Sequence, residues 1–419
     1  MEAFRILSSQ VGPEALPMLI RMLKARDHPW RDALRQRVNA FWPGRFPPPP
    51  AAAELHAVAV ELVKQLGPAG APAAPALVAL LDDDRRDGVL PAGEALIAVG
   101  EAAVPALLDG LRASSPRVRS HAAWALDEIL PPDRLAEALP GLLTLARSPA
   151  SRARARAGWV LVRMAVELHD ERARKAVEQL ARDTDETVQR NVLERNVSFR
   201  PQTALAPATL RSLLEHPDGL VRLYAAESLW WTGRDRALAL DTFTQLLREP
   251  QYIWAAALVL GRLGPDAAPA IPALVEAVRR EPVHRPDRIP ADSAMALARF
   301  GVAALPGLRE LLEDPALEVR FSAAQALREL GPAAASAVPG LLRLLRSGEP
   351  HAEIVASQAL GAIGPAAAEA IPDLRRLAAT RQGYPQAAAA EALAAIGGEE
   401  GARREMTTGT AAEPEVVAP

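Results

Sequence analysis

The stretch ALEVRFSAAQALRELGP (316–332) contains the features that decide the fold of this chain. Its apolar residues recur at positions i, i+4, i+8 and i+11, from Val319 to Leu330, and so lie on one face of an α-helix. Gly331 can adopt the positive φ that often ends a helix, and Pro332 cannot continue one. The stretch therefore predicts an amphipathic helix that ends at Gly331.

The same pattern recurs along the chain, for example in PRVRSHAAWALDEI (116–129) and GLVRLYAAESLWWTG (219–233). Glycines close such segments at intervals of roughly 30–37 residues or a multiple of this, which is the period of a repeated helix pair. These glycines are Gly67, Gly100, Gly233, Gly264, Gly301, Gly331, Gly364 and Gly397. The sequence is therefore predicted to consist of internal repeats.

A second recurring feature lies between the glycines, where a proline precedes an apolar run, as in VPALLDGL and IPALVEAV. Proline is tolerated in the first turn of a helix because its missing N–H would have no partner there. These prolines are Pro105, Pro272, Pro306, Pro339 and Pro372. Each repeat is therefore expected to be a proline-led first helix, a turn, and a second helix closed by glycine, with about ten such pairs from Ala71 to Gly397.

The composition agrees with an all-α protein. Of 419 residues, 49% are hydrophobic but only 4% are aromatic, so the apolar surface consists mainly of Ala, Leu and Val, which suit closely packed helices. One helix pair is too small to bury its own apolar face, so consecutive pairs must stack. The expected fold is an α-solenoid, a superhelix of antiparallel helix pairs.

The recurring Pro, Val-Arg, Ala-Ala and Ala-Leu positions resemble the HEAT-repeat superfamily, and specifically its short bacterial type, which also occurs in phycobilin lyases. The resemblance covers most of residues 51–397. It implies a right-handed α-solenoid and says little about function, because this fold includes scaffolds, adaptors and a few enzymes.

Three segments are expected along the chain. Residues 1–50 are predicted to form N-terminal capping helices, near 13–25 and 29–41, followed by the proline-rich spacer GRFPPPP (44–50). Residues 51–397 form the solenoid, and residues 398–419 a disordered tail. Residues 169–206 and the loop EPVHRPDRIP (281–290) depart from the repeat, either as functional loops or through drift.

Charge and cysteine content exclude several classes of function. The net charge of −3 provides no general attraction for polyanions, and the absence of Cys excludes disulfides, thiolate metal sites and Cys nucleophiles. Residues 1–20 show no secretory signal, and no uninterrupted apolar run is long enough for a membrane span. The chain is expected to be a cytoplasmic monomer, although a native start upstream of Met1 could alter the location.

In this family the second helices usually line the concave face of the solenoid. We call the recurring pattern of these helices the template; the position two residues before its recurring Leu, which is Leu327 in the stretch 316–332, should point toward that face. That position is occupied by Glu61, Glu94, Trp124, Trp159, Glu227, Leu258, Met295, Gln325, Gln358 and Glu391. Trp124 and Trp159 thus occupy equivalent places in adjacent repeats. They are interpreted either as an exposed site for a peptide or aromatic ligand, or as residues packed at the edge of the core.

The segment RSPASRARARAGWVLVR (147–163) contains only basic charges. Its arginines are Arg147, Arg152, Arg154, Arg156 and Arg163. They could hold a phosphate or an acidic peptide beside Trp159, or they could form ordinary pairs with nearby Asp and Glu residues.

Two further sets have structural interpretations. The arginines Arg119, Arg154, Arg222 and Arg320 share one template position, at which HEAT repeats commonly tie neighbouring units together. Trp230 and Trp231 with Tyr224, and Tyr252 with Trp254, form aromatic clusters that fit core packing as well as binding. The candidate partner-binding residues are Trp124, Trp159, Arg152, Arg154, Arg156, Glu227 and Trp230.

No catalytic, cofactor or metal site is predicted. The di-iron hydroxylase of this superfamily uses recurrent His-Glu pairs, and no His here is followed by Glu. The expected function is a non-catalytic scaffold that binds a protein or peptide on its concave face. The alternatives are nucleic-acid or phosphate binding through Arg147–Arg163, which the acidic net charge disfavours, and a lyase or isomerase related to the phycobilin lyases.

Overall fold

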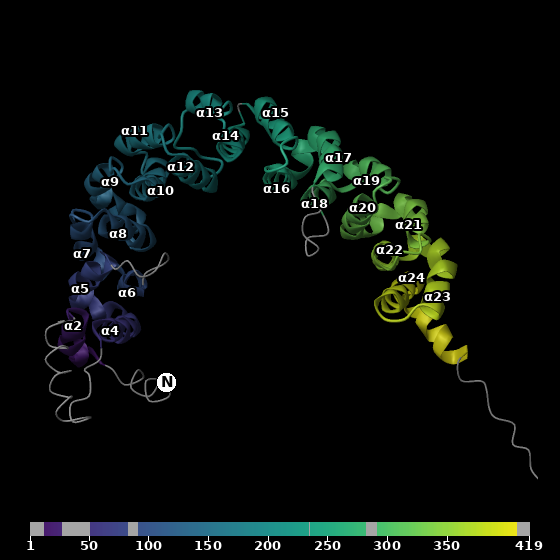
Figure 1. Cartoon of the computed structure of the whole chain (residues 1–419), viewed down its shortest axis with the longest axis horizontal. Coiled ribbons are helices and arrows are strands. Elements are labelled where there is room, and N and C mark those ends of the chain that lie inside the picture. Colours follow the sequence, from purple (N-terminus) through teal and green to yellow (C-terminus); the bar gives the residue numbers. More distant parts are fainter. Residues whose placement is uncertain (1–11, 27–50, 83–90, 234, 282–290, 409–419) are drawn as a thin grey trace, which may run out of the picture. The chain divides into compact units, whose positions relative to one another are not determined.

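The computed structural model describes residues 12–26, 51–82, 91–233, 235–281 and 291–408, with side chains up to residue 397. These residues form α-helices and short 3-10 helices, and no β-strand occurs among them (Figure 1). The chain divides into two compact units, Met1–Leu213 and Leu214–Pro419. Each unit is a stack of helices, which confirms the predicted all-α solenoid.

Unit 1 begins with the 3-10 helix η1 (Pro13–Ala15), which leads into α2 (Leu16–Leu23). The remaining helices of unit 1 are α4 (Ala52–Leu66), α5 (Ala74–Ala79), α6 (Pro91–Val99), α7 (Val104–Gly110), α8 (Pro116–Ile129), α9 (Leu139–Leu145), α10 (Ser151–Glu167), α11 (Glu171–Leu180), α12 (Glu186–Ser198) and α13 (Pro207–Leu213).

Unit 2 contains the helices that follow Leu214. They are α14 (Gly219–Thr232), α15 (Arg236–Leu246), α16 (Ile253–Leu263), α17 (Ile271–Arg280), α18 (Asp292–Arg299), α19 (Leu305–Leu311), α20 (Leu317–Leu330), α21 (Val338–Leu345), α22 (Pro350–Ile363), α23 (Ile371–Thr380) and α24 (Tyr384–Thr408).

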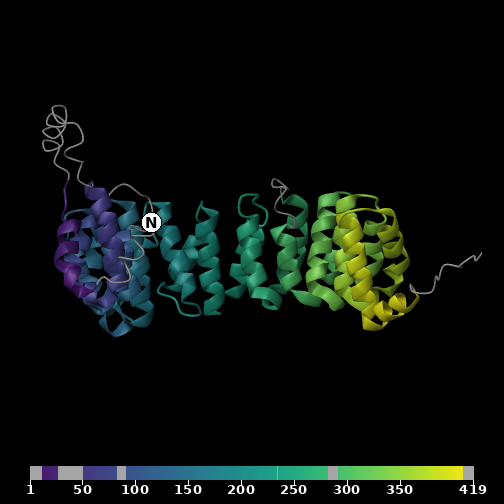
Figure 2. The ribbon, with the colours of Figure 1, turned by 90° about the horizontal axis from the view of Figure 1, so that it is seen from below.

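The helices of each unit form two layers, which Figures 1 and 2 show from two directions. We call the first helix of each pair the A helix and the second the B helix. Each A helix packs against the B helix that follows it, as α7 does against α8 and α21 against α22. B helices also pack against the B helices of neighbouring repeats, so α6, α8, α10 and α12 form one B layer in unit 1, and α16, α18, α20, α22 and α24 form another in unit 2.

The glycine and proline signals behave largely as predicted. Seven of the eight proposed glycines have positive φ, between 54° and 74°, and most lead into a 3-10 turn before the next A helix. Each of the five marked prolines lies in the first turn of an A helix. Gly397 is the exception, because α24 continues through it to Thr408. The start of the expected disordered tail is thus helical, and residues 409–419 lie outside the described residues.

The N-terminal segment is described only in part. The helix expected near residues 13–25 is present as η1 and α2, and α2 packs against α4. The helix expected at 29–41, the spacer at 44–50 and most of the loop at 281–290 lie outside the described residues.

The arginines at the recurring template position, Arg119, Arg154, Arg222 and Arg320, each hold their own B helix to the turn that precedes it. In each case the Nη1 atom donates to two successive backbone carbonyls in the turn before its own B helix, at 2.7–3.0 Å. The accepting carbonyls belong to residues 113 and 114 for Arg119, 148 and 149 for Arg154, 216 and 217 for Arg222, and 314 and 315 for Arg320. Arg154 and Arg222 also reach acidic residues of the next repeat, Asp183 and Glu249. All four arginines therefore have a structural role within their own helix pair, and the predicted tie between neighbouring units is confirmed for Arg154 and Arg222.

The ion pair between Arg154 and Asp183 predicts a pH-dependent contribution to stability. Its two nitrogen–oxygen distances are both 2.8 Å, and the side chains are only 16% and 10% exposed. The hydrogen bonds from Arg154 lower the pKa of Asp183 below 3.8, against the opposing effect of burial. Since a lowered carboxyl pKa stabilises the folded state above the unfolded-state pKa, this contribution is lost as the pH falls through the folded-state value.

We therefore expect Asp183→Asn to lower the free energy of unfolding at pH 7 by about 2 kcal/mol. The difference in the free energy of unfolding between the variant and the wild type should shrink as the pH falls below the pKa of Asp183 in the unfolded chain. Urea denaturation across this pH range measures it, with Asp266→Asn, at an exposed site in the 3-10 helix Gly264–Ala270, as the control. A difference that persists unchanged in acid would contradict the prediction.

Three stretches of the described chain are long and apolar enough to cross a membrane by length and composition alone: Pro91–Gly110, Ile253–Arg280 and Pro350–Thr380. Each consists of a B helix, a 3-10 turn and the A helix of the next repeat. Glycines with positive φ interrupt them, at Gly100, Gly264 and Gly364.

Candidate binding surface

The template position two residues before the Leu, which was expected to face a ligand, is not exposed in every B helix. Glu61, Leu258 and Glu391 are exposed, Glu227 is buried, and the remaining residues at this position are half-buried. The position therefore lies at the boundary between the B-layer surface and the packing between neighbouring B helices.

Trp124 and Trp159 both use part of their ring surface for packing. A Cβ atom placed on Gly93 of α6 would lie 2.6 Å from the Trp124 ring, so the glycine makes room for this indole. The guanidinium carbon of Arg195, on α12, lies 4.9 Å from the centre of the Trp159 ring. Both tryptophans are half-buried. The geometry thus favours the edge-of-core interpretation for at least one face of each ring.

A carboxylate at the end of α8 holds three B helices together. The side chain of Asp127 is 7% exposed and accepts from Arg163 of α10 at 3.4 Å and from Arg195 of α12 at 3.2 Å. Arg163 also donates to the backbone carbonyls of Asp127 and Leu130, at 2.6 and 3.1 Å. The Arg195 guanidinium is in turn stacked on Trp159, so this network fixes the central part of the unit 1 B layer.

The structure separates the arginines of the 147–163 segment. Arg154 and Arg163 have acidic partners, as described above, which supports the interpretation of ordinary ion pairing for these two residues. Burial lowers the pKa of Arg156, which is half-buried on α10. Arg147 and Arg152 are exposed, and Arg152 lines the cleft described below, whereas Arg147 does not.

Two residues predicted to contact a partner are buried in α14. Glu227 is 0% exposed and accepts from Arg262 of α16 at 3.0 and 3.1 Å. Trp230 is 3% exposed, with its ring centre 6.4 Å from that of Phe243 and the Arg236 guanidinium 5.3 Å from it. The prediction for these residues was wrong, because α15 and Arg262 cover the surface on which they would have been accessible.

The candidate partner-binding residues predicted from the sequence did not include Trp254 and Leu258, an exposed apolar pair on a B helix. Trp254 and Leu258 are 49% and 56% exposed and lie four residues apart on α16, so they are neighbours on one helix face. The indole N–H of Trp254 donates to the carbonyl of Gln251 at 3.1 Å, which leaves the ring as the accessible part. The available signal was Leu258 itself, a large aliphatic residue at a position that is mostly Glu or Gln in other repeats.

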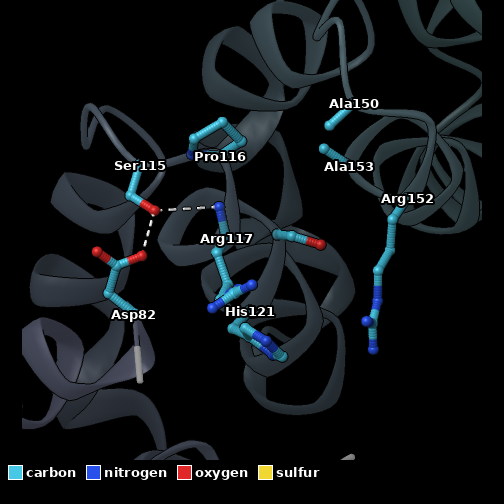
Figure 3. A pocket seen from close by; sticks show the side chains of 9 residues that line it. Asp82, Ser115, Pro116, Arg117, His121, Ala150, Arg152 and Ala153 are labelled. Carbon is cyan, nitrogen blue, oxygen red and sulfur yellow. Dashed lines mark hydrogen bonds between the residues drawn. The ribbon is translucent and has the colours of Figure 1, made fainter. Parts of the chain in front are cut away.

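A cleft of about 410 Å³ lies between the N-terminal ends of α8 and α10 (Figure 3). Arg117 and His121 of α8 line one side of it and Arg152 of α10 the other. Ser115 lies at its edge, where its hydroxyl donates to Asp82 at 2.5 Å and caps the N–H of Arg117 at 3.3 Å. Within the described residues, no group of three or more His, Asp or Glu side chains could hold a metal ion.

Comparisons with known proteins agree with this architecture. Residues 284–351 match the family model for HEAT repeats. No curated protein was found to match the sequence. Among solved structures, Kap121p bound to RanGTP matches with a TM-score of 0.56 and 14% identity, over 95% of this chain and 46% of that one. Importin beta matches with a TM-score of 0.53 and 14% identity, over 87% of this chain and 59% of that one.

The comparison with unbound Kap121p gives a TM-score of 0.53 and 15% identity over 88% of this chain. The present chain spans only 45% of the length of that protein. At this level of identity the likeness establishes the fold alone. The chain is therefore an α-solenoid in which residues 284–351 match the HEAT-repeat model.

Proposed function

We propose that this chain is a non-catalytic scaffold that binds an apolar segment of a protein partner on the B layer of unit 2. The observation that carries the proposal is the exposed pair Trp254 and Leu258 on α16. Large apolar side chains on a rigid helix are typical anchors of protein interfaces, because covering them removes apolar surface from water with little loss of entropy.

The repeat architecture supports a protein partner over a small substrate. Stacked helices offer an extended surface for a peptide or folded domain instead of an enclosed pocket. Proteins of similar fold include Kap121p bound to the extreme C-terminus of Cdc14p and a complex of Kap95 with Nup1. The proposal also includes three expectations from the sequence. The B layer lies on the concave face of the solenoid, the chain is cytoplasmic, and it is a monomer.

The test is the double variant Trp254→Ser and Leu258→Ser. Since truncating interface anchors costs about 2 kcal/mol or more, we expect the affinity for a partner to fall roughly thirtyfold or further. Partners would be identified by affinity purification from the native host with mass spectrometry, and their dissociation constants then measured with the purified full-length chain.

The matched control is Val302→Ser, which removes a 66%-exposed apolar side chain from the 3-10 turn Gly301–Ala304, outside the B helices. The control should keep wild-type affinity, and circular dichroism should be the same for all three proteins. If the double variant bound every identified partner as tightly as the control, the α16 surface would not be the binding site.

A further inference from the structure

The cleft between α8 and α10 combines basic side chains with hydroxyl groups. Arg117 and His121 approach it from α8 and Arg152 from α10 (Figure 3). Ser115, Ser120 and the carboxylate of Asp82 complete its polar lining. Residues from two adjacent repeats thus converge on one space of about 410 Å³. This site lies wholly in unit 1 and shares no residue with the α16 surface.

The electrostatic character of the cleft is positive. Burial lowers the pKa of His121, and the charges of Arg152, Arg156 and Arg117 lower it further, so three guanidinium groups act on this imidazole. The carboxylate that lines the cleft is Asp82, which accepts from Ser115 at 2.5 Å. An anion in the cleft would therefore be attracted by the two lining guanidinium groups and would favour protonation of His121.

The backbone adds to this preference. Ala150, Arg152 and Ala153, from the N-terminal end of α10, line the cleft. This helix is 17 residues long, and its N-cap residue, Ala150, provides no side-chain hydrogen bond. By contrast, the N-terminus of α8 is capped by Ser115. The positive end of the α10 dipole therefore faces the same space as the arginines.

We infer that this cleft binds the phosphate group of a phosphomonoester, held between Arg117 and Arg152. Guanidinium groups on two sides match a tetrahedral dianion, which presents several oxygens in different directions, better than a planar carboxylate, which one arginine can satisfy. The hydroxyl of Ser120 and a protonated His121 can donate to further oxygens, whereas the Ser115 hydroxyl already donates to Asp82. The cleft volume leaves space for the group that is esterified to the phosphate.

The first experiment titrates the full-length chain with inorganic phosphate at constant ionic strength and follows the imidazole resonances by NMR. We expect a saturable change at His121 and a rise in its pKa on binding. The resonance of His351, exposed on α22 in unit 2, reports non-specific effects. Arg117→Gln and Arg152→Gln should each weaken binding at least about tenfold, since each removes a charge-assisted contact.

The control is Arg147→Gln, an exposed arginine that does not line the cleft and whose replacement should leave phosphate binding unchanged. Both lining arginines are exposed, so their replacement should not unfold the chain, which circular dichroism can verify. The inference is overturned if the His121 resonance does not respond to phosphate, or if Arg117→Gln and Arg152→Gln bind as well as Arg147→Gln.

A second set of titrations distinguishes the sources of the phosphate. Glycerol phosphate represents a free small molecule, and a phosphoserine peptide, with its unphosphorylated form as control, represents a modified protein. Tighter binding of either one than of inorganic phosphate supports the site and identifies the source. Binding of duplex DNA without binding of any phosphomonoester would show that the cleft belongs to a nucleic-acid surface and would contradict the inference.

Discussion

Replacing Trp230 by alanine will lower the free energy of unfolding by about 3–5 kcal/mol, the usual cost of removing a large aromatic side chain from a core. The indole is 3% exposed and packs near the Phe243 ring and the Arg236 guanidinium. Its removal leaves a cavity between α14 and α15 that the surrounding helices can only partly fill. Urea denaturation measures the loss, and amide hydrogen exchange should be accelerated mainly in the helices that contact this cavity.

Trp254→Ala provides the matched control, because it removes the same side chain from a site that is 49% exposed. We expect this variant to lose less than about 1 kcal/mol. Equal losses for the two variants would show that the packing of Trp230 contributes little. This comparison also separates the structural tryptophan of α14 from the proposed binding tryptophan of α16.

The fold could be predicted in detail because its signals are local. A positive φ at Gly264 or Gly331 and a proline in the first turn of an A helix depend on the backbone of a few residues, and the period of these signals defines the repeat. Gly397 failed as a signal because glycine permits a helix end without enforcing one, and the backbone of α24 continues past it.

The surface was harder to predict, because helical periodicity gives the direction of a side chain but not what covers it. Glu227 and Trp124 occupy the same template position, yet the first is covered by Arg262 and the second remains half-buried. Trp159 is stacked by Arg195, which comes from the segment 169–206 that matches the repeat weakly. Such contacts depend on residues roughly one repeat away, whose identity the template does not specify.

The Arg147–Arg163 segment shows the same limit for charge. In sequence it is a block of positive charge without acidic residues, whereas in the structure Asp183 and Asp127 reach it from the neighbouring repeats. Arg152 lines the same cleft as Arg117 and His121, which the sequence places more than 30 residues away. A charge pattern along one helix therefore does not define the basic surface of a solenoid, because the neighbouring helices contribute to it.

Asp127→Ala is expected to cost about 3–5 kcal/mol, as is usual when one partner of a buried ion pair is removed. The side chains of Arg163 and Arg195 are only 14% and 20% exposed, so both charges would lose their shared acceptor in a poorly hydrated place. Arg163 retains Glu167, at 3.0 Å, whereas Arg195 retains its stacking on Trp159. The loss should therefore be largest in α12, where hydrogen exchange can detect it.

Three comparisons isolate the charge effect at Asp127. Asp133→Ala, at an exposed site in the 3-10 helix Pro132–Ala138, should change stability by less than about 0.5 kcal/mol. Asp127→Asn keeps the size of the side chain and should cost less than alanine. Combining Asp127→Ala with Arg195→Met should recover part of the loss, because the second change removes the charge that the first leaves uncompensated. If the two changes simply added, Asp127 and Arg195 would not stabilise each other, and the packing of α8 with α12 would not depend on this ion pair.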